Sequence, residues 1–168
     1  GSGPARSGSG NPGATNVLRV VGLRAGVLVR IADFSKGSIA AVIGLLIDGT
    51  SLGLACWLAS VLGHVFPITR KFRGGKGVAT GAGGCWVLFP LAGGVCTLVF
   101  LLIAKISKKV SMASILTAVF MPLSVLLFGF ELKELLAAVF LSVLILIRHR
   151  ENFKRLLSRS EHSLGIGE

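Results

Sequence analysis

The sequence predicts an all-α fold, a polytopic bundle of helices that cross a membrane. Hydrophobic residues occupy 52% of the 168 positions and the mean hydropathy is +0.81, which is too apolar for an ordinary soluble domain. Six apolar runs lie at 26–47, 52–66, 78–89, 91–104, 112–130 and 132–147. We therefore expect a single integral membrane domain over residues 1–168, with about six transmembrane helices.

The basic residues favour six spans over five. Lys and Arg outnumber Asp and Glu by 18 to 7, and they gather at 6–24, 70–76, 105–109 and 148–159. Six spans place these clusters on one side of the membrane, whereas one long kinked span over 78–105 would send two of them across. Because basic loops stay in the cytoplasm, we expect both chain ends there and only Lys133 in the opposite loops.

The formal net charge of +11 in so apolar a chain points to anionic lipid or an anionic substrate. Nucleic acid is not favoured, because the basic residues lie between apolar spans and not on a soluble face with aromatic side chains. Cys56, Cys85 and Cys96 lie in apolar runs without metal-ligand spacing, and we interpret them as small packing residues. No carboxylate and histidine ligand set is evident, so we expect neither a metal nor a cofactor.

A glycine-rich basic stretch, RGGKGVAT at 73–80, separates the second and third apolar runs. Gly74, Gly75 and Gly77 leave backbone N–H groups open to an anion, and Lys76 supplies a positive charge. A helix that starts directly after Gly77 would point its positive dipole end at the same place. The stretch predicts a phosphate site, and taken alone it fits a basic membrane anchor equally well. It is not a P-loop, because Gly77 follows Lys76 where a P-loop has Ser or Thr.

Polar residues inside or beside the spans are further candidates. Asp33 and Lys36 are one helical turn apart in the first span. They could form a structural ion pair or contact a substrate. His64 ends the second span, where a histidine is more often an interfacial hydrogen-bonding residue than a catalyst. Ser111 and Ser114 share one face at the start of the fifth span, and either bind a phosphate or bond back to their own helix.

The residues at 148–155, RHRENFKR, follow the last apolar run. On a continuing helix Arg148, Asn152 and Arg155 form one stripe, and His149 lies one turn from Asn152. A cationic end of a membrane helix is commonly an anchor. His149 and Asn152 add hydrogen-bonding groups that anchoring does not require.

Residues 9–19, SGNPGATNVLR, carry glycines and small hydrogen-bonding side chains before a helix start expected at Ala14 or Thr15. They fit a plain polar turn as well as a binding site. With six spans, this segment and the other candidate groups lie at or near the same membrane face. One phosphate would not need so many cationic and hydroxyl groups, so the set predicts a site for two.

Together these motifs resemble the bacterial membrane acyl-phosphate:glycerol-3-phosphate acyltransferases, the PlsY family. The family's usual loop is FKGGKG, in which Arg73 here replaces the first lysine and keeps the charge. The family also has a span before the first motif, which this sequence does not show, so we expect six helices in place of seven and the N-terminal span missing. The resemblance rests on residues 8–16, Arg19, 33–37, 63–67, 72–80, 111–114, Arg148, His149, Asn152 and Arg155, in family order.

This resemblance implies acyl transfer from acyl phosphate to the 1-hydroxyl of glycerol 3-phosphate, giving lysophosphatidic acid and phosphate for phospholipid synthesis. It also implies a multi-pass protein of the bacterial inner membrane with a cytoplasmic active site. The residues implied as catalytic are Ser9, Arg19, Lys76, His149 and Asn152. Those implied to bind substrate are Asn11, Thr15, Asn16, Lys36, His64, Gly74, Gly75, Gly77, Ser111, Ser114, Arg148 and Arg155.

Acyl phosphate is a mixed anhydride with a good leaving group, so the enzyme has mainly to align the hydroxyl and stabilise negative charge. We expect Lys76, Arg19 and nearby amides to stabilise that charge, while His149 or a substrate phosphate oxygen accepts the hydroxyl proton. An acyl-enzyme on Ser9 is another route, but no Ser-His-Asp arrangement is visible and direct transfer is simpler. Neither His64 nor His149 begins the His-x4-Asp motif of the other large class of glycerolipid acyltransferases.

Two other functions are compatible with the charge pattern. A small transporter or channel for phosphorylated anions would show transmembrane flux and no lysophosphatidic acid. A structural lipid-binding scaffold would tolerate Lys76→Ala and His149→Ala with little functional change. Besides the bilayer and the two substrates, the sequence identifies no partner.

Overall fold

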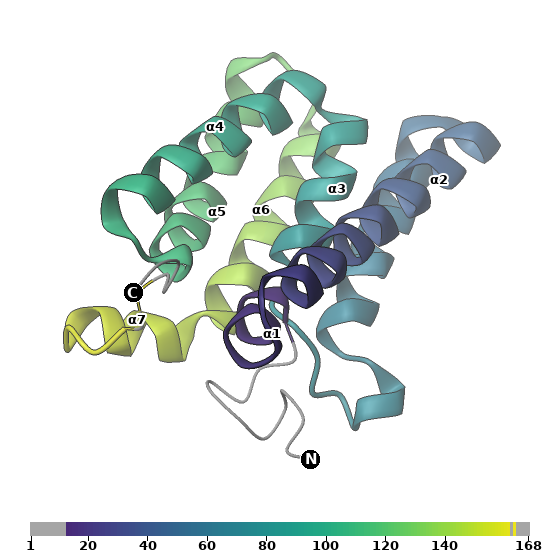
Figure 1. Cartoon of the computed structure of the whole chain (residues 1–168). Helices are drawn as coiled ribbons and strands as arrows, with labels where there is room; N and C mark the ends of the chain where they lie inside the picture. The colour runs from purple at the N-terminus through teal and green to yellow at the C-terminus, as the bar shows by residue number, and fades with distance from the viewer. Residues whose placement is uncertain (1–12, 162, 164–168) are drawn as a thin grey trace. The chain divides into compact units, whose positions relative to one another are not determined.

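The computed structural model describes residues 13–161 and 163 of the chain. It divides into two compact units, Gly1–Gly84 and Cys85–Glu168. The regular structure of the described residues is helical, which confirms the all-α fold, and each of the six apolar runs corresponds to a helix or to one arm of α2 (Figure 1). The elements are α1 (Ala14–Val21), α2 (Leu23–Val65), the 3-10 helix η1 (Ile68–Arg70), α3 (Val78–Leu88), α4 (Pro90–Ser107), α5 (Val110–Leu127), α6 (Leu132–Arg148) and α7 (Arg150–Leu157).

The long helix α2 is a hairpin of two arms (Figure 1). Asp48 and Gly49 leave helical geometry, with φ/ψ of −150°/37° and 67°/−160°. A β-carbon at Gly44 would lie 2.5 Å from the Leu52 carbonyl oxygen and 2.7 Å from Gly53 Cα, whereas a straight helix would separate such residues by about 12 Å. The chain therefore reverses between the first two apolar runs.

The helices α3 and α4 are also separate and joined by a sharp turn. Phe89 leaves the helical region, with φ −137° and ψ 65°, and Pro90 begins α4, where its missing N–H breaks no helical hydrogen bond. The Trp86 indole N–H donates to the Thr97 hydroxyl over 2.9 Å, although eleven residues separate them. Residues 78–105 thus form two short helices, as the charge pattern predicts, and not one kinked span.

Glycines allow close packing within the first unit. A β-carbon at Gly37 would overlap the Thr80 carbonyl, and one at Gly83 would overlap the Phe34 carbonyl. The backbones of α2 and α3 are therefore in direct contact, which is how small residues serve helix association in membranes.

Trp57 fills the space beside these glycines. Its side chain is fully buried, and its indole N–H donates to the Gly81 carbonyl over 3.1 Å. The indole ring lies where a β-carbon of Gly84 would be. Trp57 therefore fixes how the second arm of α2 packs against α3.

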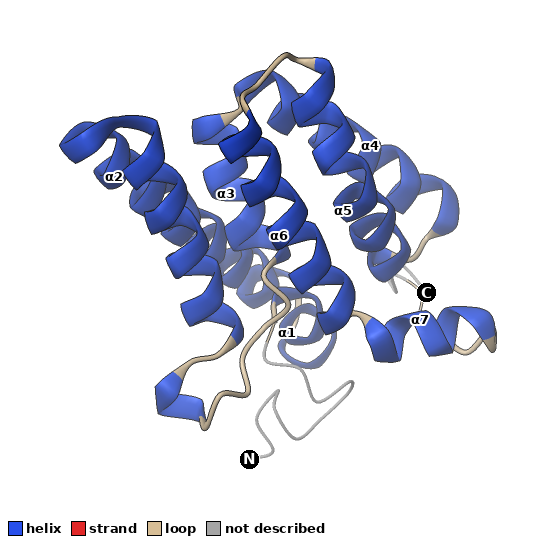
Figure 2. Ribbon diagram, turned by 180° about the vertical axis from the view of Figure 1, so that it is seen from behind, coloured by secondary structure: helices blue, strands red, loops and turns tan. Residues whose placement is uncertain are grey.

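In the second unit α5 packs against both α4 and α6 (Figure 2). The Ser142 hydroxyl of α6 donates to the Ala118 carbonyl of α5 over 2.5 Å, and the Cys96 sulfur of α4 lies 3.5 Å from the Ser124 hydroxyl of α5. Hydrogen bonds between small polar side chains are typical of membrane helices. Cys56, Cys85 and Cys96 are all free thiols, and the last two are buried, in keeping with their interpretation as packing residues.

Three elements, α2, α4 and α5, are long and apolar enough to cross a membrane, while α3 is a shorter apolar helix. Large apolar side chains are exposed on these helices. Lipid is the environment that such a surface requires, since water would disfavour it. Examples on α2, α4 and α5 are Leu46, Ile47, Leu101, Ile106, Val119 and Leu127.

Candidate active site

The motif at 9–19 ends in α1. This helix begins at Ala14 after an extended residue, which confirms the predicted start. Asn16, in its first turn, is only 2% exposed, and Thr15 beside it is half-buried. Three predicted groups, Ser9, Asn11 and the side chain of Arg19, lie outside the described part of the chain.

We name residues 73–77 the glycine loop. It follows two residues, 71–72, whose φ angles are left-handed, and it ends at Gly77 with φ +82°, a value that favours glycine. The helix α3 begins immediately afterwards, at Val78, as predicted. The positive end of its dipole is therefore next to Lys76 in the chain.

Two glycine amides hold this loop against the end of α2. The Gly74 N–H donates to the Val65 carbonyl over 3.1 Å, and the Gly75 N–H donates to the His64 carbonyl over 3.2 Å. Both carbonyls belong to the last turn of α2, where acceptors have no partner within the helix. These amides thus cap α2, and the groups best placed to hold an anion here are Lys76 and the first N–H groups of α3.

The loop also lies flat against His64. A β-carbon at Gly75 would overlap the His64 imidazole at Nε2, and one at Gly74 would overlap the His64 carbonyl. Both glycines are buried. They are needed here because the backbone approaches another residue too closely for a side chain.

Asp33 joins Lys36 and His64 into one group. Its Oδ1 lies 2.9 Å from Lys36 Nζ and 3.4 Å from His64 Nδ1. The side chains of Asp33 and His64 are only 8% and 12% exposed, whereas that of Lys36 is 57% exposed. The predicted ion pair is present, and it includes a histidine that the sequence analysis treated separately. We call these three residues and the glycine loop the loop cluster.

In the second unit, His149 marks a bend between α6 and α7 (Figures 1 and 2). The sequence analysis treated 148–155 as one continuing helix, and this is wrong: α6 ends at Arg148 and α7 starts at Arg150. Two reoriented helices cannot share the predicted stripe. Asn152 and Arg155 still lie one turn apart on α7, but half-buried Arg148 belongs to α6.

The imidazole of His149 is buried and oriented by its own helix. Its Nδ1 lies 2.8 Å from the Ile145 carbonyl oxygen. Because a carbonyl only accepts hydrogen bonds, Nδ1 must carry a proton, and in the neutral ring Nε2 is then the basic nitrogen. This tautomer suits a general base that acts through Nε2.

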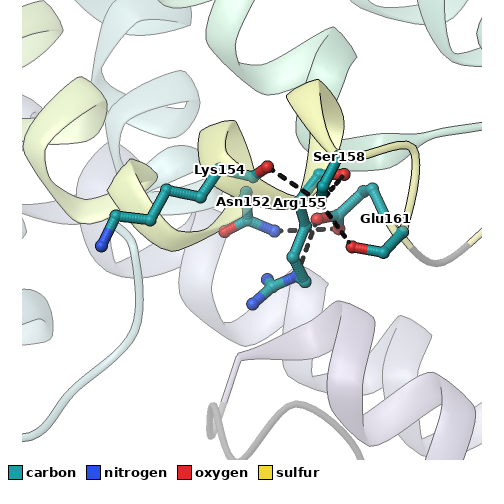
Figure 3. Close-up of polar contacts among 6 residues, drawn as sticks. Asn152, Lys154, Arg155, Ser158 and Glu161 are labelled. Atoms are coloured by element: carbon teal, nitrogen blue, oxygen red, sulfur yellow. Dashed lines mark hydrogen bonds and ion pairs between the residues drawn. The ribbon is translucent and has the colours of Figure 1, made fainter.

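Glu161 binds two of the predicted site residues (Figure 3). Its Oε1 accepts a hydrogen bond from Asn152 Nδ2 over 3.0 Å, and its Oε2 accepts one from Arg155 Nε over 2.9 Å. Burial raises the pKa of the Glu161 carboxyl, but the hydrogen bonds from Asn152 and Arg155 and the Arg155 charge outweigh it, so the net pKa is lowered. We call Asn152, Arg155 and Glu161 the tail cluster.

The serines at the start of α5 differ in their contacts. The Ser114 hydroxyl donates to the Val110 carbonyl over 2.9 Å, which is the structural alternative that the sequence left open. Ser111 is buried, and its hydroxyl has no hydrogen-bond partner among the described residues. Sequence reasoning missed Glu161, because it lies nine residues beyond Asn152 and outside any helix.

Among the described residues, His, Cys, Asp and Glu form no group that could hold a metal ion.

Residues 1–159 match a family model described as "Glycerol-3-phosphate acyltransferase". A glycerol-3-phosphate acyltransferase of Endomicrobium trichonymphae is 41% identical over 160 residues, which cover 95% of this chain and 80% of the relative. One from Aquifex aeolicus is 42% identical over 161 residues, covering 92% of this chain and 82% of the relative. The chain belongs to the glycerol-3-phosphate acyltransferase family.

Solved structures agree with this family membership. The crystal structure of PlsY (YgiH), an integral membrane glycerol 3-phosphate acyltransferase in its glycerol 3-phosphate form, has a TM-score of 0.93 and 41% identity. The match covers 96% of this chain and 82% of that one. The lysophosphatidic acid form of the same enzyme has a TM-score of 0.88 and covers 92% and 80%. The present chain, as a member of this family with apolar helices, is thus a multi-pass integral membrane protein.

In this acyltransferase family member, the predicted site residues fall into two groups. The first unit brings Lys36 and His64 to the glycine loop, and the second brings Arg155 to the Asn152 side chain through Glu161. The sequence analysis did not name Glu161, and it considered Asp33 only together with Lys36, as a structural ion pair or as substrate contacts. Both are buried carboxylates, and each has a partner beyond the reach of one helical turn: His64 for Asp33, and Asn152 for Glu161.

Proposed function

We propose that this chain transfers an acyl group from an acyl phosphate to the 1-hydroxyl of glycerol 3-phosphate, giving lysophosphatidic acid and inorganic phosphate. The supporting observation is its likeness over nearly the whole chain to PlsY structures in glycerol 3-phosphate and lysophosphatidic acid forms. Those two molecules are the acceptor and the product of this reaction. The acyl phosphate donor rests on the motif resemblance, above all on the glycine loop and its lysine.

In this proposal the glycine loop and the start of α3 hold a phosphate. Lys76 contributes a point charge next to the first N–H groups of a helix, which have no intrahelical acceptor. The same groups stabilise negative charge that develops when the acyl–phosphate bond breaks. Arg19 adds a second cationic group, with Ser9, Asn11, Thr15 and Asn16 as supporting contacts.

His149 is the proposed general base. The hydrogen bond from Nδ1 to the Ile145 carbonyl leaves Nε2 as the nitrogen that accepts the proton of the glycerol hydroxyl. The hydroxyl oxygen bonds to the acyl carbon, the carbon–oxygen bond to phosphate breaks, and phosphate leaves with its electron pair. A phosphate oxygen of the substrate is the alternative acceptor for the same proton.

The tail cluster binds the second phosphate in this proposal. Arg155 and Asn152 are held by Glu161, so their side chains are preorganised. Arg148, Ser111 and Ser114 are supporting contacts. The positive-inside pattern of the loops supports a site on the cytoplasmic side of the bacterial inner membrane.

The test uses the purified full chain in proteoliposomes with acyl phosphate and glycerol 3-phosphate. We expect lysophosphatidic acid and phosphate in equal amounts, and no phosphate release above that of empty vesicles when glycerol 3-phosphate is omitted. A stoichiometric burst of phosphate without the acceptor would indicate an acyl-enzyme, for example on Ser9. Flux of glycerol 3-phosphate without lysophosphatidic acid would refute the proposal and support a transporter.

A further inference from the structure

The glycine loop has a support that its own sequence does not reveal. His64, the second-last residue of α2, contacts Gly75 in two ways: its carbonyl accepts the Gly75 N–H over 3.2 Å, and its Nε2 edge lies where a β-carbon of Gly75 would be. The same Gly75 precedes Lys76 directly. The position of the imidazole therefore limits where the backbone before Lys76 can lie.

The imidazole is in turn held from its other side. Asp33 Oδ1 lies 3.4 Å from His64 Nδ1, and the Asp33 side chain is only 8% exposed. Lys36 pairs with the same oxygen over 2.9 Å and compensates its charge. A continuous set of contacts thus runs from Lys36 through Asp33 and His64 to the glycine loop. All of it lies within the first unit.

We propose that Asp33 and His64 are positioning residues that fix the conformation of the glycine loop, an inference that rests on the proposed function of this loop as a phosphate site. His64 then acts through the backbone of Gly75, and Asp33 acts by orienting the His64 ring. Neither needs to touch a substrate. Their loss should therefore raise the KM of the substrate whose phosphate the loop holds, and change kcat less.

Two conservative substitutions separate the two contacts of the ring. In His64→Asn the amide nitrogen takes the place of Nδ1 and keeps the Asp33 contact, but the edge that faces Gly75 is lost. In His64→Gln the amide takes the place of Nε2 and keeps the Gly75 contact, but the Asp33 contact is lost. We expect each to raise one KM by roughly threefold to tenfold, the effect of a lost hydrogen bond or packing contact.

Combining Gly75→Ala with each His64 variant gives the decisive test of the contact between Gly75 and the His64 ring. In Gly75→Ala alone, the methyl group overlaps the His64 ring, and we expect KM to rise at least about tenfold because the loop must shift. In the His64→Asn background that space is vacant, so adding Gly75→Ala should change KM by less than about twofold. In the His64→Gln background the overlap remains, and the full effect of Gly75→Ala should return. Additive effects in both backgrounds would overturn the proposal.

Hydrogen exchange of the loop gives a readout independent of activity. In the full chain, Asp33→Ala and His64→Asn should speed exchange of the Gly74 and Gly75 amides at least about tenfold, while Asp33→Asn, which keeps an acceptor oxygen, restores most protection. Glu131→Ala is the matched control, since Glu131 also pairs with a lysine, Lys133, over 3.1 Å but is exposed.

The two readouts separate this proposal from the one on which it rests. Faster loop exchange in a chain without acyl transfer would refute the proposed function and keep the positioning role. Unchanged exchange and unchanged KM in Asp33→Ala and His64→Asn, with normal transfer in the wild type, would refute the positioning role alone.

Discussion

Removal of the Glu161 carboxylate should destabilise the carboxyl-terminal part of the fold by a predictable amount. The carboxylate is only 3% exposed and accepts hydrogen bonds from Asn152 and from Arg155, whose side chain is 31% exposed. Hydrogen bonds to a charged group contribute about 1.5–3 kcal/mol each, and partial exposure places the Arg155 bond at the low end. Glu161→Ala should therefore cost about 3 kcal/mol.

Thermal unfolding of the purified full chain in detergent measures this loss. At about 2–4 °C per kcal/mol for a chain of this size, the expected fall in Tm is about 6–12 °C. Glu151→Ala is the control, because Glu151 is 57% exposed and its contacts to Lys154 and Arg150 are 3.4 and 3.6 Å long, so its loss should cost at most about 0.5 kcal/mol. Equal shifts for Glu161→Ala and Glu151→Ala would refute the reasoning.

The same carboxylate predicts a pH dependence. Its net pKa in the folded chain is lowered from the ordinary value of 4.5, so folding favours the ionised form. Its contribution to stability is then fully present above about pH 4.5 and is lost as the pH falls through the lower folded pKa. The stability difference between wild type and Glu161→Gln should thus shrink below pH 4.5, and a difference that stays constant to lower pH would contradict the assignment.

Three further predictions concern the loop, the base and the helix packing. Lys76→Ala should reduce acyl transfer at least about 100-fold without a change in Tm, as expected for a lost charge stabiliser; near-normal turnover would count against the loop as a phosphate site. His149→Asn keeps a donor for the Ile145 carbonyl but removes Nε2, so kcat should fall about 100-fold with Tm preserved, and an unchanged kcat would favour a substrate phosphate oxygen as the base. Gly84→Ala should destabilise the chain by about 1–3 kcal/mol because its methyl group overlaps Trp57, whereas Gly63→Ala, with nothing within 4 Å, should be neutral in the same unfolding assay.

The helices could be predicted because their signals are local. The run expected at 112–130 corresponds to α5 (Val110–Leu127), and the run at 91–104 corresponds to α4 (Pro90–Ser107). Hydropathy, proline position and the distribution of basic loops are read from neighbouring residues, so one sequence is sufficient. The helix start at Val78 was predicted for the same reason.

The contacts that build the site could be predicted only in part. Asp33 and Lys36 are close because one helical turn joins them, but nothing local brings His64 to the same carboxylate. Asn152 and Arg155 share a face of α7, but Glu161 reaches them by a turn of the chain after the helix. The glycines of the loop were predicted to expose amides, and two of those amides cap α2. Tertiary partners of this kind leave no periodicity in the sequence.

The hydrogen bond from His149 to Ile145 comes from residues one turn apart in the same segment. The geometry of α6 therefore contributes to the orientation of the ring. Exchanging the carboxyl-terminal segment or the glycine loop between family members should leave this imidazole in place. Chimeric chains could in this way vary substrate preference while the proposed proton acceptor stays constant.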